Sequence, residues 1–353
     1  MADFSVSIQT HNRSVTQMRG SEDLIQSLNR RIDAVLKPLL PPRTRCALLD
    51  FPTHINVGDN AIWLGEKAWL KRNGVDVVYS CDLTTYSRKR LAATLGHGTL
   101  LLHGGGNLGD LYPNHQQFRE QIIRDFPNNP IIQFSQSLHF QSEKNVQRAQ
   151  SVFNRHSNFT LLVRTQRSLD RARKTFKIET LLCPDMAFAI GALERPQQPR
   201  KEVLWLLRKD VESAVKDIAL TNGECERADW LTESPTTLHR INRFLTRRAG
   251  FSRGFARLHE YFPEAYDLLA KNRLAWGYRI LSRGKVVITD RVHGHILSLL
   301  LGIPNVLLDN SYGKVKSFYD TWTKGCELTR WADSPEEAFA LAKAFISSHH
   351  GES

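Results

Sequence analysis

Short apolar segments typical of β-strands alternate with longer segments of helical periodicity along most of this sequence. Such an alternation predicts parallel sheets with helices on both faces, the α/β class. Strands are expected at residues 46–51, 75–79, 99–103, 130–134, 159–164, 179–183, 202–208, 285–290 and 303–309. Helices are expected near 22–40, 59–71, 88–95, 115–125, 143–155, 166–175, 235–249, 257–282, 292–301 and 335–347.

A segment rich in proline and glutamine, residues 193–201, interrupts this alternation and predicts a linker. The 353 residues have the length of two ordinary domains. We expect Rossmann-like domains at 21–195 and 196–353 that face each other across a cleft, with ligands at the carboxyl ends of both sheets. Residues 1–20 are polar and aperiodic and predict a mobile leader. The last helix is free to pack back on the N-terminal domain.

Charge is the informative part of the composition. The chain has 48 lysines and arginines against 36 acidic residues, a net charge of +12, and 32 of these cations are arginines. Arginine suits flat, bidentate contacts with carboxylates and phosphates, so an anionic ligand or surface is expected.

Other sequence features exclude several classes of protein. The five cysteines form no Cys-x-x-Cys pair, which argues against a zinc knuckle or a disulfide framework. No apolar run approaches the roughly 18 residues of a membrane span, and the N-terminus lacks the apolar core of a secretory signal. We therefore expect a soluble, cytoplasmic protein.

The first motif lies between the strand at 46–51 and the helix that follows it. Asn56 and Asp59 flank Gly58, which permits a tight turn. In one interpretation Asp59 caps the helix by accepting its first free N–H groups. In the other, Asn56 and Asp59 lie at the mouth of the cleft and act on a substrate hydroxyl. Both interpretations are compatible.

The second motif, His103-Gly-Gly-Gly-Asn107-Leu-Gly-Asp110, follows the strand at 99–103 and matches G-x-G-x-x-G. A dinucleotide site is disfavoured, because the next strand ends in Ser135-Gln136 where an acid should bind the ribose. Three consecutive glycines let a ligand approach the backbone, whose N–H groups suit an anion. A structural turn is the alternative, and we favour a ligand-facing loop.

The third motif, Asp290-Arg291-Val-His293, follows the very apolar strand at 285–290. Charged residues at the end of a buried strand are costly unless they are used, and sites of α/β proteins lie there. Arg291 suits a carboxylate or phosphate, and His293 can exchange a proton near neutral pH. A structural Asp–Arg pair is the alternative. Other strand ends also finish in charged residues, namely Arg164, Asp185 and Arg208.

An arginine-rich stretch follows in the segment 238–249. Its apolar residues fall on one helical face, and the rest of the helix carries Arg240, Arg243, Arg247 and Arg248. This is either a solvated face or a patch for anionic lipid headgroups or a diphosphate-linked acceptor. Strands with interleaved aromatic residues, typical of nucleic-acid binding, are absent from the sequence pattern, so no nucleic-acid partner is expected.

Taken together in order and spacing, the motifs resemble the polysaccharide pyruvyl transferase family. The matching segments are Asn56-Val-Gly-Asp-Asn-Ala, Gly104-Gly-Gly-Asn-Leu-Gly-Asp, Val163-Arg-Thr-Gln-Arg-Ser, Pro184-Asp, Leu207-Arg-Lys-Asp and Thr289-Asp-Arg-Val-His-Gly. One departure is Thr165, where the family usually has a glutamate, and this weakens any role of that acid.

The resemblance implies a GT-B-like fold of two Rossmann-like domains and phosphoenolpyruvate as donor, without metal or cofactor. The acceptor it implies is a sugar of an exopolysaccharide repeat unit, which we expect to be lipid-linked, and the product is a pyruvate ketal. A nucleotide-sugar glycosyltransferase and a scaffold that binds membrane or acidic polymer are the alternatives.

On this basis we assign roles as a hypothesis. His293 is the general acid and Asp59 the base that activates a hydroxyl. Arg164, Arg208 and Arg291 bind the donor and the departing phosphate. The remaining donor-binding candidates are Gly104, Gly105, Gly106 and Asn107. The candidates for acceptor binding or support are Asn56, Asp110, Asp185 and Asp290.

Overall fold

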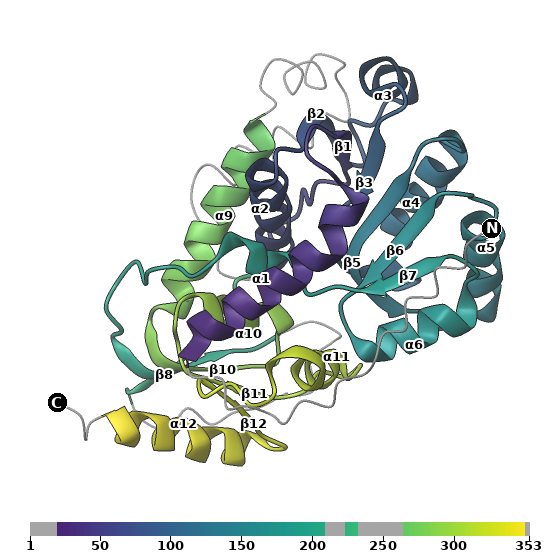
Figure 1. The fold of residues 1–353 in the computed structure, drawn as a ribbon. Helices are drawn as coiled ribbons and strands as arrows, with labels where there is room; N and C mark the ends of the chain where they lie inside the picture. Colours follow the sequence, from purple (N-terminus) through teal and green to yellow (C-terminus); the bar gives the residue numbers. More distant parts are fainter. Residues whose placement is uncertain (1–19, 209–222, 232–263, 350–353) are drawn as a thin grey trace.

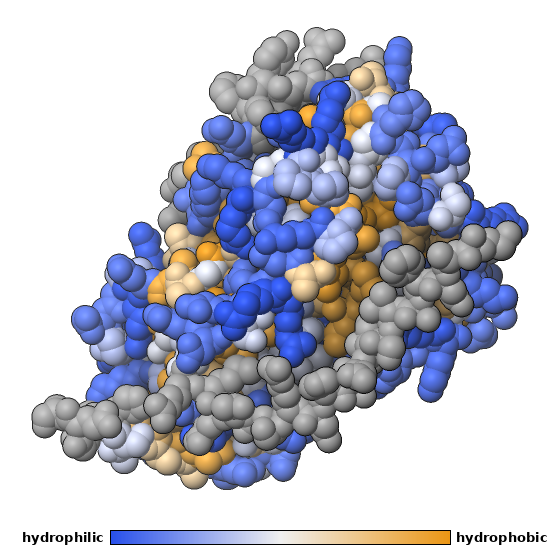
Figure 2. All heavy atoms as spheres, in the orientation of Figure 1, coloured by the Kyte–Doolittle hydropathy of each residue, from blue (hydrophilic) through white to orange (hydrophobic). Residues whose placement is uncertain are grey.

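The computed structural model describes residues 20–208, 223–231 and 264–349, and these form two parallel β-sheets flanked by helices (Figure 1). The parallel α/β class is therefore confirmed. In the same orientation, Figure 2 shows a face on which hydrophilic side chains predominate, in line with 24% charged residues.

The first sheet has the strand order β2-β1-β3-β5-β6-β7, with β4 paired to β5. Its strands are β1 (Arg45–Leu49), β2 (Asp76–Cys81), β3 (Thr99–Leu102), β4 (Gly105–Gly109), β5 (Ile131–His139), β6 (Phe159–Val163) and β7 (Glu179–Leu182). Its helices are α1 (Gly20–Leu39), α2 (Val57–Arg72), α3 (Arg88–Leu95), α4 (Pro113–Asp125), α5 (Glu143–Phe153) and α6 (Gln166–Thr175), with the 3-10 turn η1 (Met186–Ile190). Alternate residues of β1 belong to different hydrophobic clusters, so this central strand is buried on both faces.

The second sheet has the order β12-β11-β10-β8-β9. Its strands are β8 (Lys201–Leu206), β9 (Cys225–Ala228), β10 (Gly284–Thr289), β11 (Asn305–Leu307) and β12 (Thr329–Trp331). The helices here are α9 (Ala265–Leu281), α10 (Val292–Leu300), α11 (Lys314–Phe318) and α12 (Pro335–His349), with the π-helical turn η2 (Tyr319–Thr323).

The strand β4 was not expected, because its sequence Gly-Gly-Asn-Leu-Gly has no β-branched residue. Gly105 and Gly109 have φ values of 132° and 130°, which favour glycine. A Cβ on Gly109 would lie 1.7 Å from the carbonyl oxygen of His139 in β5. The glycines therefore allow β4 to pair closely with β5. The short strands β9 and β12 were also not expected.

One hydrophobic cluster joins the two sheets, since it contains Leu48 of β1 and Leu204 of β8 together with residues of α1, α2, α9 and α10. The helix α9 follows the linker in sequence but packs against α2. A Cβ on Gly277 of α9 would lie 2.3 Å from a methyl group of Val57. Arg273 of α9 donates to the carbonyl oxygens of Pro52 and Thr53, each at 2.8 Å. α9 thus fixes the β1–α2 loop from the second half of the chain.

The last helix, α12, packs on β10 and β11 of the second sheet, where Ala338 and Ala342 are buried. Small side chains allow this close packing. Of these two helices, α9 packs on the first half of the chain and α12 packs on the second sheet. The sequence had left open that the last helix, α12, would pack back on the N-terminal domain. The expected leader, the helix at 235–249 and the start of that at 257–282 lie outside the described residues. No helix of the described ranges is long and apolar enough to cross a membrane.

Candidate functional site

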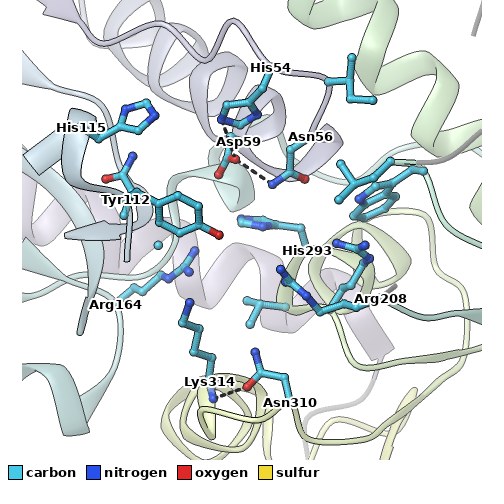
Figure 3. A pocket seen from close by; sticks show the side chains of 17 residues that line it. His54, Asn56, Asp59, Tyr112, His115, Arg164, Arg208, His293, Asn310 and Lys314 are labelled. Carbon is cyan, nitrogen blue, oxygen red and sulfur yellow. Dashed lines mark hydrogen bonds and ion pairs between the residues drawn. The ribbon is translucent and has the colours of Figure 1, made fainter. Parts of the chain in front are cut away.

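A pocket of about 430 Å³ lies where the carboxyl ends of strands from both sheets meet (Figure 3). The first sheet contributes His54, Ile55, Asn56, Asp59, Gly106, Asn107, Tyr112, His115 and Arg164. The second contributes Arg208, Trp230, Leu231, Arg291, Val292, His293, Asn310 and Lys314. Ligand sites of open α/β sheets lie in this position.

Asp59 is held in the first turn of α2 by its neighbours. Asn56, and not Asp59, is the N-cap: its side chain accepts from the Gly58 N–H and donates to Asp59 Oδ2 at 2.7 Å. His54 Nε2 lies 3.4 Å from the same oxygen. Burial alone would raise the pKa of Asp59, but His54, His293 and other nearby groups outweigh it and hold this pKa below its usual value. Asp59 is therefore an ionised carboxylate that faces the pocket.

His293 enters the pocket from the first turn of α10. Its ring packs on Gly58 so closely that a Cβ there would lie 2.3 Å from Nδ1. Its Nε2 is 3.4 Å from Asp185 Oδ2, which also accepts from Arg164 at 2.7 Å. Burial would raise the pKa of Asp185, but His293, Arg164 and the Ala187 N–H lower it far below its usual range. Asp185 is thus a buried anion that ties Arg164 of one sheet to His293 of the other.

The arginines of the pocket are fixed from behind. Arg164 also donates to Ser137 at 2.8 Å, and Arg291 donates to Asp229 at 2.7 Å. The guanidinium of Arg291 stacks over the Trp230 ring, 5.6 Å from its centre. Figure 3 shows the His293 ring between Asp59 and His54 on one side and Arg164, Arg208 and Lys314 on the other. The pocket therefore has a cationic half and a half that carries Asp59.

The glycine-rich segment meets the pocket only at its end. Gly106 and Asn107 line it, whereas Gly104 and Gly105 do not. The Gly104 N–H donates to Glu66 at 2.8 Å. It therefore does not bind a donor anion, contrary to the prediction from the sequence. A Cβ on Gly106 would lie 3.0 Å from the Arg164 guanidinium, so the glycine makes room for this side chain.

Asn107 is positioned by a buried polar network. Its Oδ1 accepts from Arg119 at 2.8 Å and from Gln136 at 2.9 Å. With Oδ1 occupied in this way, the amide N–H₂ is left for the pocket.

Five predicted site residues lie outside the pocket lining: Gly104 and Gly105, the buried Asp185 described above, and Asp110 and Asp290. Asp110 accepts from the N–H groups of Gln141 and Ser142, each at 2.9 Å, and so fixes the β5–α5 connection. Asp290 is fully buried and accepts from the Arg208 N–H at 3.0 Å. Burial raises the pKa of Asp290 to about 6, although Arg208 and Arg291 oppose this. Asp110 and Asp290 support the site and do not face it.

Several lining residues were not singled out from the sequence, among them His54, Tyr112, His115, Asn310 and Lys314. His115 lies 2.9 Å from Asp50, a residue with φ of 72° directly after β1. The signal for His54 was its position in the loop after β1, and that for Lys314 was its position at the start of α11, shortly after β11. Within the residues the structure describes, no three His, Cys, Asp or Glu side chains gather to hold a metal ion.

A family model described as polysaccharide pyruvyl transferase matches residues 56–312 of this chain. The "Putative pyruvyl transferase EpsO" of Bacillus subtilis is 33% identical over 313 residues, which cover 86% of this chain and 93% of that protein. "Pyruvyl transferase 1" of Schizosaccharomyces pombe is 32% identical over 321 residues, 84% of this chain and 75% of that protein.

Among solved structures, a functionally uncharacterized protein of Klebsiella pneumoniae has a similar fold. It superposes with a TM-score of 0.57 at 19% identity, over 87% of this chain and 99% of that one. The family model covers well over half of the chain. Its matched range contains all lining residues of the pocket except His54, Ile55 and Lys314. The chain therefore belongs to the polysaccharide pyruvyl transferase family and is a transferase.

Proposed function

We propose that this protein transfers pyruvate from phosphoenolpyruvate to two hydroxyls of one sugar in an exopolysaccharide repeat unit, forming a pyruvate ketal and releasing phosphate. The observation that carries the proposal is the division of the pocket. In Figure 3, Arg164 and Arg208 lie on one side of the His293 ring and Asp59 lies on the other, and Arg291 lines the same pocket. The arrangement of two parallel sheets around this pocket resembles that of GT-B transferases.

The cationic half suits this donor. Phosphoenolpyruvate carries a carboxylate and a phosphate on a three-carbon unit, and guanidinium groups bind both through paired N–H donors. Arg164 and Arg291 are each only 3% exposed and are already held by a carboxylate, so their orientation is set before the donor arrives. The same cations stabilise the charge that develops on the departing phosphate.

The proposal requires a group that protonates the donor. Ketal formation requires a proton at the methylene carbon C3 of the donor and bonds from two hydroxyl oxygens to C2. The imidazole of His293 lines the pocket, and the ionised carboxylate of Asp185 lies 3.4 Å from its Nε2, where it favours the protonated ring. We assign His293 the role of general acid.

The acceptor sugar is assigned to the half that contains Asn56 and Asp59, whose amide and carboxylate suit hydroxyl groups. We infer a lipid-linked acceptor at the cytoplasmic face of a membrane, in line with the net charge of +12. The contact expected through Arg240, Arg243, Arg247 and Arg248 lies outside the described residues.

Calorimetric titration with phosphoenolpyruvate tests the donor assignment. Wild type is expected to bind saturably in EDTA as well as with added Mg²⁺. Arg208→Ala and Arg291→Lys are expected to bind about 10-fold to 100-fold more weakly, the loss of one or two charged hydrogen bonds. Arg200→Ala is the matched control, because this arginine is 64% exposed and lies 3.8 Å from Glu226.

A nucleoside diphosphate sugar is titrated in parallel. Binding of the nucleotide sugar without binding of phosphoenolpyruvate would overturn the proposal in favour of a glycosyltransferase. Binding of phosphoenolpyruvate that is unaffected by either variant would remove these arginines from the donor site.

A further inference from the structure

The pocket holds a second histidine–aspartate pair that the donor chemistry does not use. His54 lies in the β1–α2 loop, and its Nε2 is 3.4 Å from Asp59 Oδ2. Both residues line the pocket, and Figure 3 shows them on the opposite side of His293 from Arg208 and Lys314. The pair therefore lies in the half of the pocket that we assign to the acceptor.

The loop that carries His54 is rigid for identifiable reasons. Arg273 of α9 binds the carbonyl oxygens of Pro52 and Thr53, and Asn60 donates to the carbonyl oxygen of His54 at 3.4 Å. These contacts fix the backbone on both sides of the ring. The side chain is nevertheless 45% exposed, and because it lines the pocket this open surface is reachable by a ligand.

Asp59 is poorly suited to remove a proton. Its Oδ2 already accepts from Asn56 at 2.7 Å and faces His54 Nε2. This carboxylate oxygen is thus occupied by contacts within the protein.

His54 has the opposite character. The protein groups around the ring remove part of its water and lower its pKa, with smaller contributions from His115, Arg273 and His103, and these outweigh the opposing charge of Asp59. Because the unperturbed pKa of histidine is already about 6.5, we expect a mainly neutral ring at pH 7. Nε2 is the ring nitrogen that faces Asp59, at 3.4 Å, and among the described residues no hydrogen bond involves Nδ1. A neutral ring that carries its proton on Nε2 presents a lone pair on Nδ1.

We infer that His54 is the general base for the acceptor hydroxyl and that Asp59 is a positioning residue that sets the tautomer of His54. This inference rests on the proposed pyruvyl transfer. In the first step His293 gives a proton to C3, the hydroxyl oxygen bonds to C2, and the hydroxyl proton passes to His54 Nδ1.

In the second step the bond from C2 to the phosphate oxygen breaks, and the phosphate leaves with the proton that His54 received. The second hydroxyl then bonds to C2, and its proton restores His293. The two hydroxyl protons thus end on the methyl group and the phosphate, and both histidines return to their starting forms.

Phosphate release is measured with phosphoenolpyruvate and a panel of methyl glycosides that each present a pair of neighbouring hydroxyls. His54→Ala is expected to bind phosphoenolpyruvate like wild type and to release phosphate about 10²-fold to 10⁴-fold more slowly, the usual contribution of a general base. Because the side chain is open to the pocket, added imidazole is expected to restore part of the rate. It is not expected to restore Asp59→Asn, which keeps the histidine but loses the acceptor that orients it.

His97→Ala is the matched control, because His97 is an exposed histidine in the α3–β3 connection. The ¹⁵N spectrum of the histidine side chains gives a readout that needs no substrate. It is expected to show His54 as the neutral Nε2–H tautomer at pH 7 in wild type and a changed tautomer balance in Asp59→Asn.

Four results would overturn the assignment: a rate of His54→Ala within about threefold of wild type, loss of phosphoenolpyruvate binding in that variant, no response to imidazole, or a protonated His54 at pH 7. Failure of the proposed function looks different. In that case wild type itself neither binds phosphoenolpyruvate nor releases phosphate from it, and the role of His54 falls with it.

Discussion

Replacing Gly58 by alanine should separate catalysis from folding. Gly58 lies in the first turn of α2, where its N–H donates to Asn56, a bond that alanine retains. The new Cβ would lie 2.3 Å from Nδ1, 2.5 Å from Cγ and 2.7 Å from Cβ of His293. Because the contact includes the base of the side chain, rotation of the ring alone does not relieve it.

Ordinary contact begins at 3.4 Å, so His293 or the first turn of α2 must move by about 1 Å. A displacement of this size in a catalytic group costs on the order of 10²-fold in rate. The free energy of unfolding should fall by little, because overpacking costs ~1–3 kcal/mol and the higher helix propensity of alanine offsets ~1 kcal/mol of this cost. The arginines are not displaced, so phosphoenolpyruvate affinity should stay within a few-fold of wild type.

Three measurements on Gly58→Ala test this reasoning: phosphate release with the glycoside panel, calorimetric donor affinity and thermal unfolding. Gly223→Ala is the matched control, because a Cβ there meets nothing within 4 Å. Wild-type turnover in a folded Gly58→Ala protein would refute the role of Gly58 in placing His293, and with it the geometric basis of the acid assignment.

Three further predictions concern stability. Gly277→Ala brings a Cβ within 2.3 Å of Val57 and should destabilise the α2–α9 contact by ~1–3 kcal/mol in denaturant unfolding, whereas an unchanged midpoint would contradict the close packing. The pKa of Asp290 is raised from 3.8 to about 6, so the folded protein binds a proton on Asp290 more tightly than the unfolded chain does. The stability of the folded state that depends on this proton is fully present below pH 3.8 and is lost as the pH rises through 6. Asp290→Asn should therefore gain stability relative to wild type as the pH rises from 3.8 to 6, reaching on the order of 3 kcal/mol at pH 7, and a pH-independent difference would contradict it. Arg119→Met removes the buried donor to Gln116 and Asn107 and should cost ~2–5 kcal/mol in thermal or denaturant unfolding, with wild-type stability as the contrary result.

The sequence predicted those site residues whose position follows from strand periodicity. Arg164 comes directly after β6, and Arg208 and Arg291 lie two residues after the ends of β8 and β10; the carboxyl ends of parallel strands lie at one edge of a sheet. His293 follows two residues after Arg291, in the first turn of α10. Apolar strand patterns thus located the cationic half of the pocket.

The other half depends on tertiary contacts that no local pattern encodes. His54 is placed because Arg273, more than 200 residues away in sequence, binds the carbonyl oxygens beside it. Asn56 and Asp59 are both chemically able to cap α2, and only the geometry decides that Asn56 does so. Similarly, the strand conformation of Gly105–Gly109 arises from pairing with β5 and not from its own propensity.

The fate of the donor carbon tests the proposed pyruvyl transfer most directly. The protein is incubated with [2-¹³C]phosphoenolpyruvate and the glycoside panel, and the products are followed by ¹³C NMR together with phosphate release. Pyruvyl transfer predicts a labelled quaternary carbon bonded to a methyl group, a carboxylate and two oxygens of one sugar, formed in step with phosphate and lost in His293→Gln. Label that stays in phosphoenolpyruvate, while a nucleoside diphosphate sugar is consumed under the same conditions, would contradict it.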